Sequence, residues 1–274
     1  MTIFASRHGY PDKVMWIMSS VFRYTNFGIV SWIHDDFFVV NGKENREKSL
    51  DGLRDNLKRV FVKKKRQCLV LFPEGGFLRN RKQISHKFAQ KNGLPLLEYC
   101  TLPRTGALEV IMEILRPPGA QNQEQVKIRL SQKEQSGIKY SPTLNKVVDV
   151  TIAYPDGKPL GIIDTLSAWR PPCTTHVHYK IFDIEQVPRD PKELRHWMYN
   201  LYIEKDKLLE EFYEKGAFPR TGAGLEGSGT EVGKPRELVH NPVRFIGLHL
   251  FFIASTYLFW TLFPEVYSYV PDTN

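Results

Sequence analysis

The chain has 274 residues, 42% of them hydrophobic, and a formal net charge of +8 at pH 7 with a pI of about 9.3. This length suits one large domain or two small ones, and the basic balance favours anionic partners such as nucleic acid, anionic lipid or a phosphorylated cofactor. Three separated cysteines, Cys68, Cys100 and Cys173, fit neither a disulfide framework nor a zinc site, and they favour a reducing compartment. Residues 1–10 lack the apolar core of a secretory signal, so none is expected.

Apolar periodicity in the first half of the chain predicts alternating strands and helices. Helices are predicted over residues 13–22, 43–65, 81–92 and 105–115, and strands over residues 37–40, 68–72 and 98–102. From residue 37 onward this alternation favours a layered α/β domain with a mostly parallel sheet. In open sheets of this kind, ligands bind beyond the carboxyl ends of the strands.

The second half of the chain has a different organisation. Residues 117–142 are polar and are interpreted as a flexible insert. Strands over 147–154 and 175–182 and a helix over 190–213 then form a second α/β part, which we delimit as residues 143–216. His176 and His178 share one face of their strand, which suits a metal pair or structural histidines, and the absence of a third ligand nearby favours the latter.

Residues 217–242 are interpreted as a linker. Residues 222–227 match the dinucleotide fingerprint G-x-G-x-x-G, but no strand precedes the match and no helix follows it, so we reject that interpretation.

A mostly apolar segment, residues 243–263, is long enough to span a hydrocarbon core of roughly 30 Å, so a C-terminal transmembrane helix is predicted. A buried or interfacial helix is the alternative, because one histidine and several hydroxyl residues interrupt the segment. Lys234, Arg236 and Arg244 lie on its N-terminal side and no Lys or Arg follows it. This asymmetry predicts that the main domain lies in the cytosol.

The most informative stretch begins with the strand predicted at residues 68–72. Pro73 ends the strand, and Glu74, Gly75 and Gly76 follow directly. Three basic residues come next: Arg79, Arg81 and Lys82. Backbone N–H groups at a glycine turn and arginine side chains both bind phosphate oxygens, so the stretch suits a phosphate-bearing ligand. The alternative is a tight turn with a solvated basic rim.

Residues 72–77, Phe-Pro-Glu-Gly-Gly-Phe, resemble the Phe-Pro-Glu-Gly-Thr-Arg block of the glycerolipid acyltransferases. Further blocks, in the order found in the family's lysophosphatidylglycerol-acylating branch, lie at residues 24–31, 36–38, 102–106, 151–155 and 175–179. The resemblance runs from about residue 12 to the end of the chain, and it makes residues 12–116 a truncated acyltransferase domain.

The resemblance implies a function as well as a fold. It implies transfer of an acyl chain from acyl-CoA, a co-substrate, to a lysophospholipid, with no resident cofactor or metal and a location at the endoplasmic reticulum membrane. Membrane lipid is then the expected partner, and nucleic acid, which only the charge suggests, is not. The substrate-binding residues that it implies are Pro73, Glu74, Gly75, Gly76, Arg79 and Arg104.

The chain also departs from the family pattern. The N-terminal catalytic block, Asn-His-x-x-x-x-Asp, is not found: His8 and Asp12 are four positions apart and no asparagine precedes His8. We therefore expect that the chain starts after that block, as an isoform or a fragment would, and that it has little activity alone. A family arginine in the second block is replaced by Val40, with Lys43 nearby. The alternative function is a non-catalytic, membrane-anchored module that binds lipid or a partner.

Overall fold

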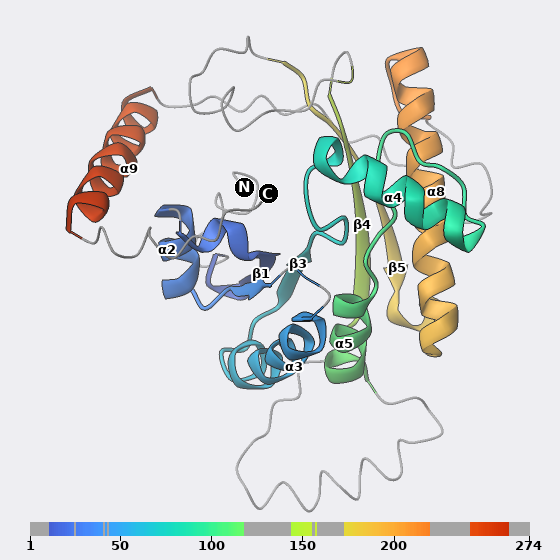
Figure 1. Ribbon diagram of the computed structural model, residues 1–274, viewed down its shortest axis with the longest axis horizontal. Helices are drawn as coiled ribbons and strands as arrows, with labels where there is room; N and C mark the ends of the chain where they lie inside the picture. Colours follow the sequence, from blue (N-terminus) through green and yellow to red (C-terminus); the bar gives the residue numbers. More distant parts are fainter. Residues whose placement is uncertain are drawn as a thin grey trace, which may run out of the picture.

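The computed structural model describes residues 11–24, 26–40, 42, 44–117, 144–154, 157, 173–219 and 242–262. In this part of the chain two small sheets and several helices form a mixed α/β structure (Figure 1). The first sheet has three parallel strands in the order β2-β1-β3, which confirms the expected parallel sheet. Its strands are β1 (Val14–Ser19), β2 (Phe37–Val39) and β3 (Cys68–Leu71).

The central strand β1 contradicts the predicted helix at residues 13–22, where the chain forms β1 followed by a 3₁₀ helix, η2 (Ser20–Tyr24). A central parallel strand is covered on both faces, so its sequence is a continuous apolar run without alternation. Met15 and Met18 are both buried although their odd separation places them on opposite faces of the strand. Such a run cannot be distinguished from a buried helix by periodicity alone. Residues 29–33, in turn, belong to the helix α2 (Asn26–Ile33).

The helices predicted after β2 are confirmed. The helix α3 (Arg46–Asn56) continues into a π-helical segment (Leu57–Val62), and α4 (Leu78–Asn92) ends at Gly93 in a left-handed cap with φ of 65°. With α5 (Gly106–Leu115), α3 covers the sheet and buries its core residues. These core residues are Met15, Ile17, Leu53, Leu57, Phe61, Val110, Ile111 and Leu115.

The second sheet is a pair of antiparallel strands, β4 (Lys146–Ala153) and β5 (His176–Asp183), as predicted. Figure 1 shows the long helix α8 (Pro191–Lys215) running beside this pair. Its ends are well capped: Asp190 accepts from two backbone N–H groups, and Gly216 adopts a left-handed conformation. This agrees with the helix predicted at residues 190–213.

The two histidines of β5 pack against aromatic rings. The ring of His176 lies 4.8 Å from that of Phe212, and the ring of His178 lies 5.4 Å from that of Phe218, centroid to centroid. No group of three potential metal ligands occurs among the described residues. The structural interpretation of the pair therefore fits these contacts.

The helix α9 (Pro242–Leu262) corrects the prediction of a transmembrane helix at residues 243–263. The segment is helical, yet within the described residues no helix combines the length and apolar character needed to cross a membrane. Polar residues interrupt the apolar run: His249, Ser255, Thr256 and Thr261. The cytosolic placement of the main domain depended on that segment and stays a prediction. The insert proposed at residues 117–142 and the glycine fingerprint at 222–227 fall almost wholly outside the described residues.

Candidate functional site

The stretch singled out in the sequence forms a tight turn at the carboxyl end of β3. The backbone N–H of Gly75 donates to the carbonyl of Phe72 at 3.1 Å. Proline at the second position and glycine at the fourth suit a type I turn. Gly75 has a φ of 69°, in the left-handed region that favours glycine. Because the turn follows the last residue of β3, it lies beyond the carboxyl end of a parallel strand, which is where open α/β folds bind their ligands.

Arg81 and Arg104 lie against this turn, and Arg46 is close enough to Arg104 to affect its pKa. We call these three residues the arginine cluster. The backbone N–H of Arg104 donates to the carbonyl of Pro73 at 2.8 Å, and its side chain lies over Gly75. A Cβ added to Gly75 would lie 3.1 Å from Arg104 Cδ and Nε, and one added to Gly76 would lie 3.1 Å from Arg81 Cγ. Both glycines thus leave room for an arginine side chain.

The arginine cluster concentrates positive charge beside the turn. Loss of solvent around the guanidinium lowers the pKa of Arg104, although the residue as a whole is exposed, and the neighbouring charges of Arg81 and Arg46 lower it further. Burial also lowers the pKa of Arg81, whose Nε is buried without a hydrogen-bond partner among the described residues. No ion pair in the described part of the chain involves Arg46 or Arg81. Arginine stays charged at all relevant pH values, so the cluster suits an anion.

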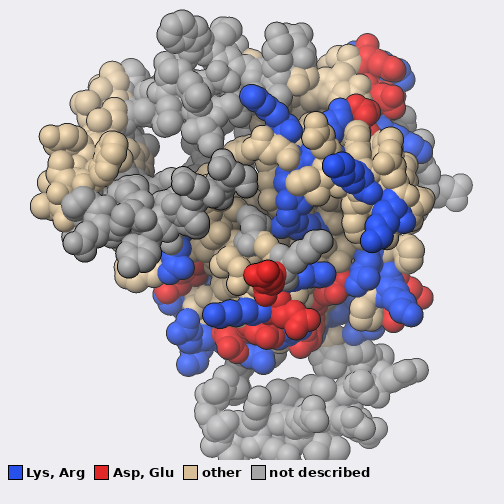
Figure 2. All heavy atoms as spheres, in the orientation of Figure 1, with Lys and Arg blue, Asp and Glu red and all other residues tan. Residues whose placement is uncertain are grey.

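The surface around the turn is also basic. The helix α4, which starts directly after the two glycines, contains five basic residues and no acidic one: Arg79, Arg81, Lys82, Lys87 and Lys91. Figure 2 shows Lys and Arg side chains gathered over this part of the molecule, whereas acidic side chains lie among them near α3 and α5. The positive field over α4 would attract an anionic ligand.

Glu74 is hydrogen-bonded to Thr101 in a neighbouring segment. Its Oε2 accepts from the backbone N–H and the hydroxyl of Thr101, both at 3.4 Å. Burial raises the pKa of the Glu74 carboxyl, and the Thr101 hydrogen bonds and the positive charge of Lys205 oppose that rise. The predicted substrate residue Glu74 therefore links the turn to the rest of the fold.

The partner of that link is a segment that we call the strap, residues 98–104. The sequence predicts a strand at 98–102, and this is wrong, because the N–H groups of residues 98–102 donate to side chains instead of a neighbouring strand. Those of Glu98, Tyr99 and Cys100 donate to the carboxylate of Asp206, at 3.0, 2.7 and 3.0 Å. That of Leu102 donates to Ser85 Oγ at 2.9 Å. The strap thus runs from α8 to the turn.

Of the other predicted site residues, Arg79 is exposed and makes no hydrogen bond or ion pair with a described residue. Arg81 and Arg46 were missed as site residues. Residues 79 and 81 are two positions apart on α4, which separates them by about 200° around the helix axis. The structure turns Arg81 towards Gly76, and the missing Cβ of that glycine is the sequence signal that could have selected it.

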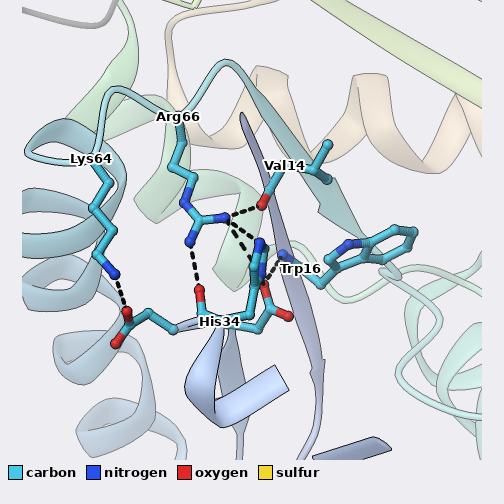
Figure 3. Close-up of polar contacts among 7 residues, drawn as sticks. Val14, Trp16, His34, Lys64 and Arg66 are labelled. Carbon is cyan, nitrogen blue, oxygen red and sulfur yellow. Dashed lines mark hydrogen bonds and ion pairs between the residues drawn. The ribbon is translucent and has the colours of Figure 1, made fainter. Parts of the chain in front are cut away.

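A second polar cluster, which includes a histidine and an aspartate in contact, lies at the opposite edge of the sheet (Figure 3). His34 Nδ1 lies 2.9 Å from Asp36 Oδ1, and Arg66 Nη1 lies 2.8 Å from His34 Nε2. Arg66 also donates to the carbonyls of Val14 and His34. Since arginine can only donate, His34 Nε2 accepts, and Nδ1 donates to Asp36.

This cluster does not provide a base for the turn. It lies where β1, β2 and β3 begin, whereas the turn lies where β3 ends. At about 3.3 Å per residue, the four residues of β3 alone separate the two edges by roughly 13 Å. Its hydrogen bonds fix the starts of the three strands, and we assign it a structural role.

One histidine of the chain has an aspartate at the fifth position after it, a spacing that our sequence analysis overlooked. These residues are His178 and Asp183, without a preceding asparagine. Both lie on β5, where an odd separation places side chains on opposite faces, so they cannot form a pair. His86 donates from Nε2 to the carbonyl of Leu97 at 2.7 Å. No described histidine forms a hydrogen bond with residues 73–76.

Two further features are poor candidates for chemistry. A hollow of about 550 Å³ between β2 and α3 lies away from the turn and is lined by Phe37, Gly52, Asp55, Asn56 and Arg59.

Burial raises the pKa of the Cys100 thiol and that of the Cys68 thiol, so both stay protonated and neither is a ready nucleophile.

Comparison with known proteins gives one family match and several relatives. The family described as "Acyltransferase C-terminus" matches residues 169–247. The human protein acyl-CoA:lysophosphatidylglycerol acyltransferase 1 is 38% identical over 262 residues, which cover 93% of this chain and 66% of that protein. The mouse protein of the same name is 41% identical over 214 residues, or 76% of this chain and 55% of that protein.

A more distant relative is the putative 1-acyl-sn-glycerol-3-phosphate acyltransferase acl-12 of Caenorhabditis elegans. It is 33% identical over 211 residues, which cover 76% of this chain and 51% of that protein. The chain thus spans between half and two thirds of the length of these relatives. No solved structure shows a significant match.

Proposed function

The chain belongs to the glycerolipid acyltransferase family, and from that premise we propose that it carries the phosphate-binding part of an acyl-CoA:lysophospholipid acyltransferase. The relatives' names specify lysophosphatidylglycerol and 1-acyl-glycerol-3-phosphate as acceptors. Both acceptors carry a phosphate ester close to the hydroxyl that is acylated. A lysophosphatidylglycerol-like acceptor is therefore the proposed substrate class. A location at the endoplasmic reticulum membrane rests on the resemblance alone.

The arginine cluster is the observation that supports this proposal. Arg104 and Arg81 lie against the two glycines of the turn, and the Nε of Arg81 is buried without a partner among the described residues. A buried N–H donor without an acceptor is costly unless a ligand completes its hydrogen bond. A phosphate supplies several acceptor oxygens and the compensating negative charge. Bound there, it would hold the lipid beyond the carboxyl end of β3.

The reaction needs a group that the described site does not provide. In acyl transfer, the acceptor oxygen bonds to the thioester carbonyl carbon, the carbon–sulfur bond breaks, and the hydroxyl proton is finally carried by the CoA thiol. A general base that removes this proton contributes about 10²–10⁴-fold in rate. The family's Asn-His-x-x-x-x-Asp block is absent from this sequence. We therefore propose that these 274 residues alone bind the acceptor but transfer acyl chains poorly.

The test is a calorimetric titration of the chain with a short-chain, monomeric lysophosphatidylglycerol, alongside a monoacylglycerol of equal chain length. We expect the phosphate-bearing lipid to bind more tightly. Arg104→Ala should weaken its binding by about 10-fold or more, because hydrogen bonds to charged groups contribute roughly 1.5–3 kcal/mol. Lys87→Ala removes an exposed charge on α4 and should change the affinity for this lipid less than about twofold. Equal affinity for the two lipids, or equal effects of the two variants, would contradict the proposal.

A non-catalytic binding module is the second candidate function, and it is favoured because no histidine in the described part of the chain is bonded to the turn. Both candidates predict the same lipid binding, so an assay of acyl transfer separates them. Supplying the missing N-terminal block on a separate polypeptide should restore turnover if the chain is part of an enzyme. A dedicated binding module would gain no turnover.

A further inference from the structure

We propose that Asp206 of α8 is a positioning residue for the arginine cluster. It would act through the strap and hold Arg104 over Gly75 without touching the ligand itself. The inference rests on the proposed function and deepens it, because it gives the C-terminal family region a role in acceptor binding. Asp206 lies inside the matched residues 169–247.

The anchoring contact is specific in geometry. The two carboxylate oxygens of Asp206 accept from three consecutive backbone N–H groups of the strap, with donor–acceptor distances between 2.7 and 3.0 Å. The Cys100 thiol adds a weak donor to Asp206 Oδ1 at 3.5 Å. A carboxylate that accepts several backbone N–H groups forms strong, charge-assisted bonds. The start of the strap is therefore fixed to α8.

The remaining residues of the strap pass this constraint to the turn. Thr101, directly after the anchored segment, donates twice to Glu74. Leu102 N–H donates to Ser85 of α4, and Arg104 N–H donates to Pro73. Cys100 carries the last N–H group that is bonded to Asp206, and only three residues of the chain lie between it and Arg104. A loosened start would therefore displace Thr101 and Arg104 together.

The helix that carries Asp206 is itself held firmly. The neighbouring Lys205 is buried and donates to Asp149 Oδ1 at 2.7 Å and to the carbonyl of Val150 at 2.9 Å, both on β4. Tyr202, one turn earlier, is buried against the strap together with Leu97, Cys100 and Leu102. A rigid element that holds a binding residue through directed hydrogen bonds is what precise positioning requires.

The experiment measures binding of short-chain lysophosphatidylglycerol and amide hydrogen exchange in the same proteins: wild type, Asp206→Ala, Asp206→Asn and Glu204→Gln. Glu204, two positions earlier on α8, is exposed and serves as the matched control. Cooperative thermal unfolding shows that each variant is folded. We expect Asp206→Ala to weaken binding by about tenfold, within the range of coupled neighbours, and to speed exchange in residues 98–104.

The conservative variant and a double mutant separate positioning from general destabilisation. Asparagine keeps one acceptor oxygen for Tyr99 and Cys100 but loses the acceptor for Glu98, so Asp206→Asn should have an intermediate effect on both readouts. If Asp206 acts through Arg104, the Asp206→Ala effect on affinity should largely vanish in an Arg104→Ala background. Additive effects would overturn the inference.

The outcomes separate the two proposals. If wild type binds the lipid and Asp206→Ala binds it equally well, or if exchange in the strap is unchanged, the positioning role is wrong and the proposed function stands. If wild type shows no preference for the phosphate-bearing lipid, the proposed function fails and the positioning role fails with it.

Discussion

Arg79 and Arg81 show how the choice of residue at the site depends on helix geometry. Family resemblance selected Arg79 as the residue that supplies the charge of the family arginine, because Gly76 and Phe77 stand in place of Thr-Arg. The structure leaves Arg79 exposed and brings Arg81 against Gly76. The sequence could thus predict that basic side chains gather near the glycine turn. The individual arginine could not be predicted, because that choice depends on where α4 begins, which sequence patterns define only to within a few residues.

These two arginines give a direct prediction. Arg81→Ala should weaken lysophosphatidylglycerol binding by about 10-fold, because a buried guanidinium donor is lost. Arg79→Ala should weaken it by less, since an exposed charge contributes mainly through the long-range field. Calorimetry at two salt concentrations measures both effects, and the Arg79 effect should fade at high salt. A larger effect of Arg79→Ala than of Arg81→Ala would contradict this prediction and favour Arg79 as the phosphate-binding residue.

Glu74 gives a prediction about pH. Burial raises the pKa of its carboxyl above the ordinary value of 4.5. Between that value and the raised pKa, the folded chain binds more protons than the unfolded chain. The contribution of Glu74 to the free energy of unfolding therefore falls as pH rises through this window. Glutamine cannot ionise and can still accept from Thr101.

We therefore expect the free energy of unfolding of Glu74→Gln, relative to wild type, to rise as pH increases from about 4.5 and then to level off. Denaturant titrations at several pH values measure this difference. Gln83→Ala, an exposed substitution on α4, is the control and should show a nearly constant difference, because neither side chain ionises. A difference for Glu74→Gln that falls with pH would show that the carboxylate is stabilised in the folded chain.

At the scale of elements, α8 is the largest support of the site. Its periodicity, its aspartate cap and its terminal glycine are all visible in the sequence, and the helix was predicted closely. The contact of Asp206 with the strap was not predictable, because the two lie more than 100 positions apart and no pattern marks the pairing. The sequence of the strap suggested a strand. Its contacts with distant side chains leave no pattern in the sequence, so the error could not be seen there.

The buried ion pair between Lys205 of α8 and Asp149 of β4 should stabilise the fold. Lys205→Met should lower the free energy of unfolding by about 3–5 kcal/mol, because it leaves the carboxylate of Asp149 buried without its partner. The matched control is Lys180→Met, which removes the more exposed pair with Glu204 and should cost less than about 1 kcal/mol. Denaturant unfolding compares the two. Equal effects would contradict the prediction, because they would mean that the Asp149 carboxylate becomes hydrated when Lys205 is replaced.

At the scale of the whole molecule, the parallel sheet separates two polar clusters with different roles. The arginine cluster lies at the carboxyl edge, where open α/β sheets bind ligands, and the His34–Asp36–Arg66 cluster lies where the strands start. The sequence predicted the parallel sheet correctly, and ligand binding beyond the carboxyl ends of its strands stays a prediction. Sequence reasoning mistook the central strand for a helix, because complete burial removes the alternation that identifies a strand.

The whole chain also yields a prediction for catalysis. With acyl-CoA and lysophosphatidylglycerol, the 274-residue chain should turn over at least about 10²–10⁴-fold more slowly than the human relative assayed alongside it, because no described histidine is bonded to the turn to act as a general base. Release of free CoA measures the rate. Turnover comparable to that of the relative would show that another group of this chain acts as the base.

The most direct test of the account locates the bound phosphate. An NMR titration of the isotope-labelled chain with glycerol 3-phosphate should shift the backbone amides of Gly75 and Gly76 and the Nε–H signals of Arg81 and Arg104. The signals of His34 and Arg66 should stay unchanged. Shifts confined to the His34–Asp36–Arg66 edge, or none at the turn at saturating ligand, would contradict the claim that this turn holds the acceptor.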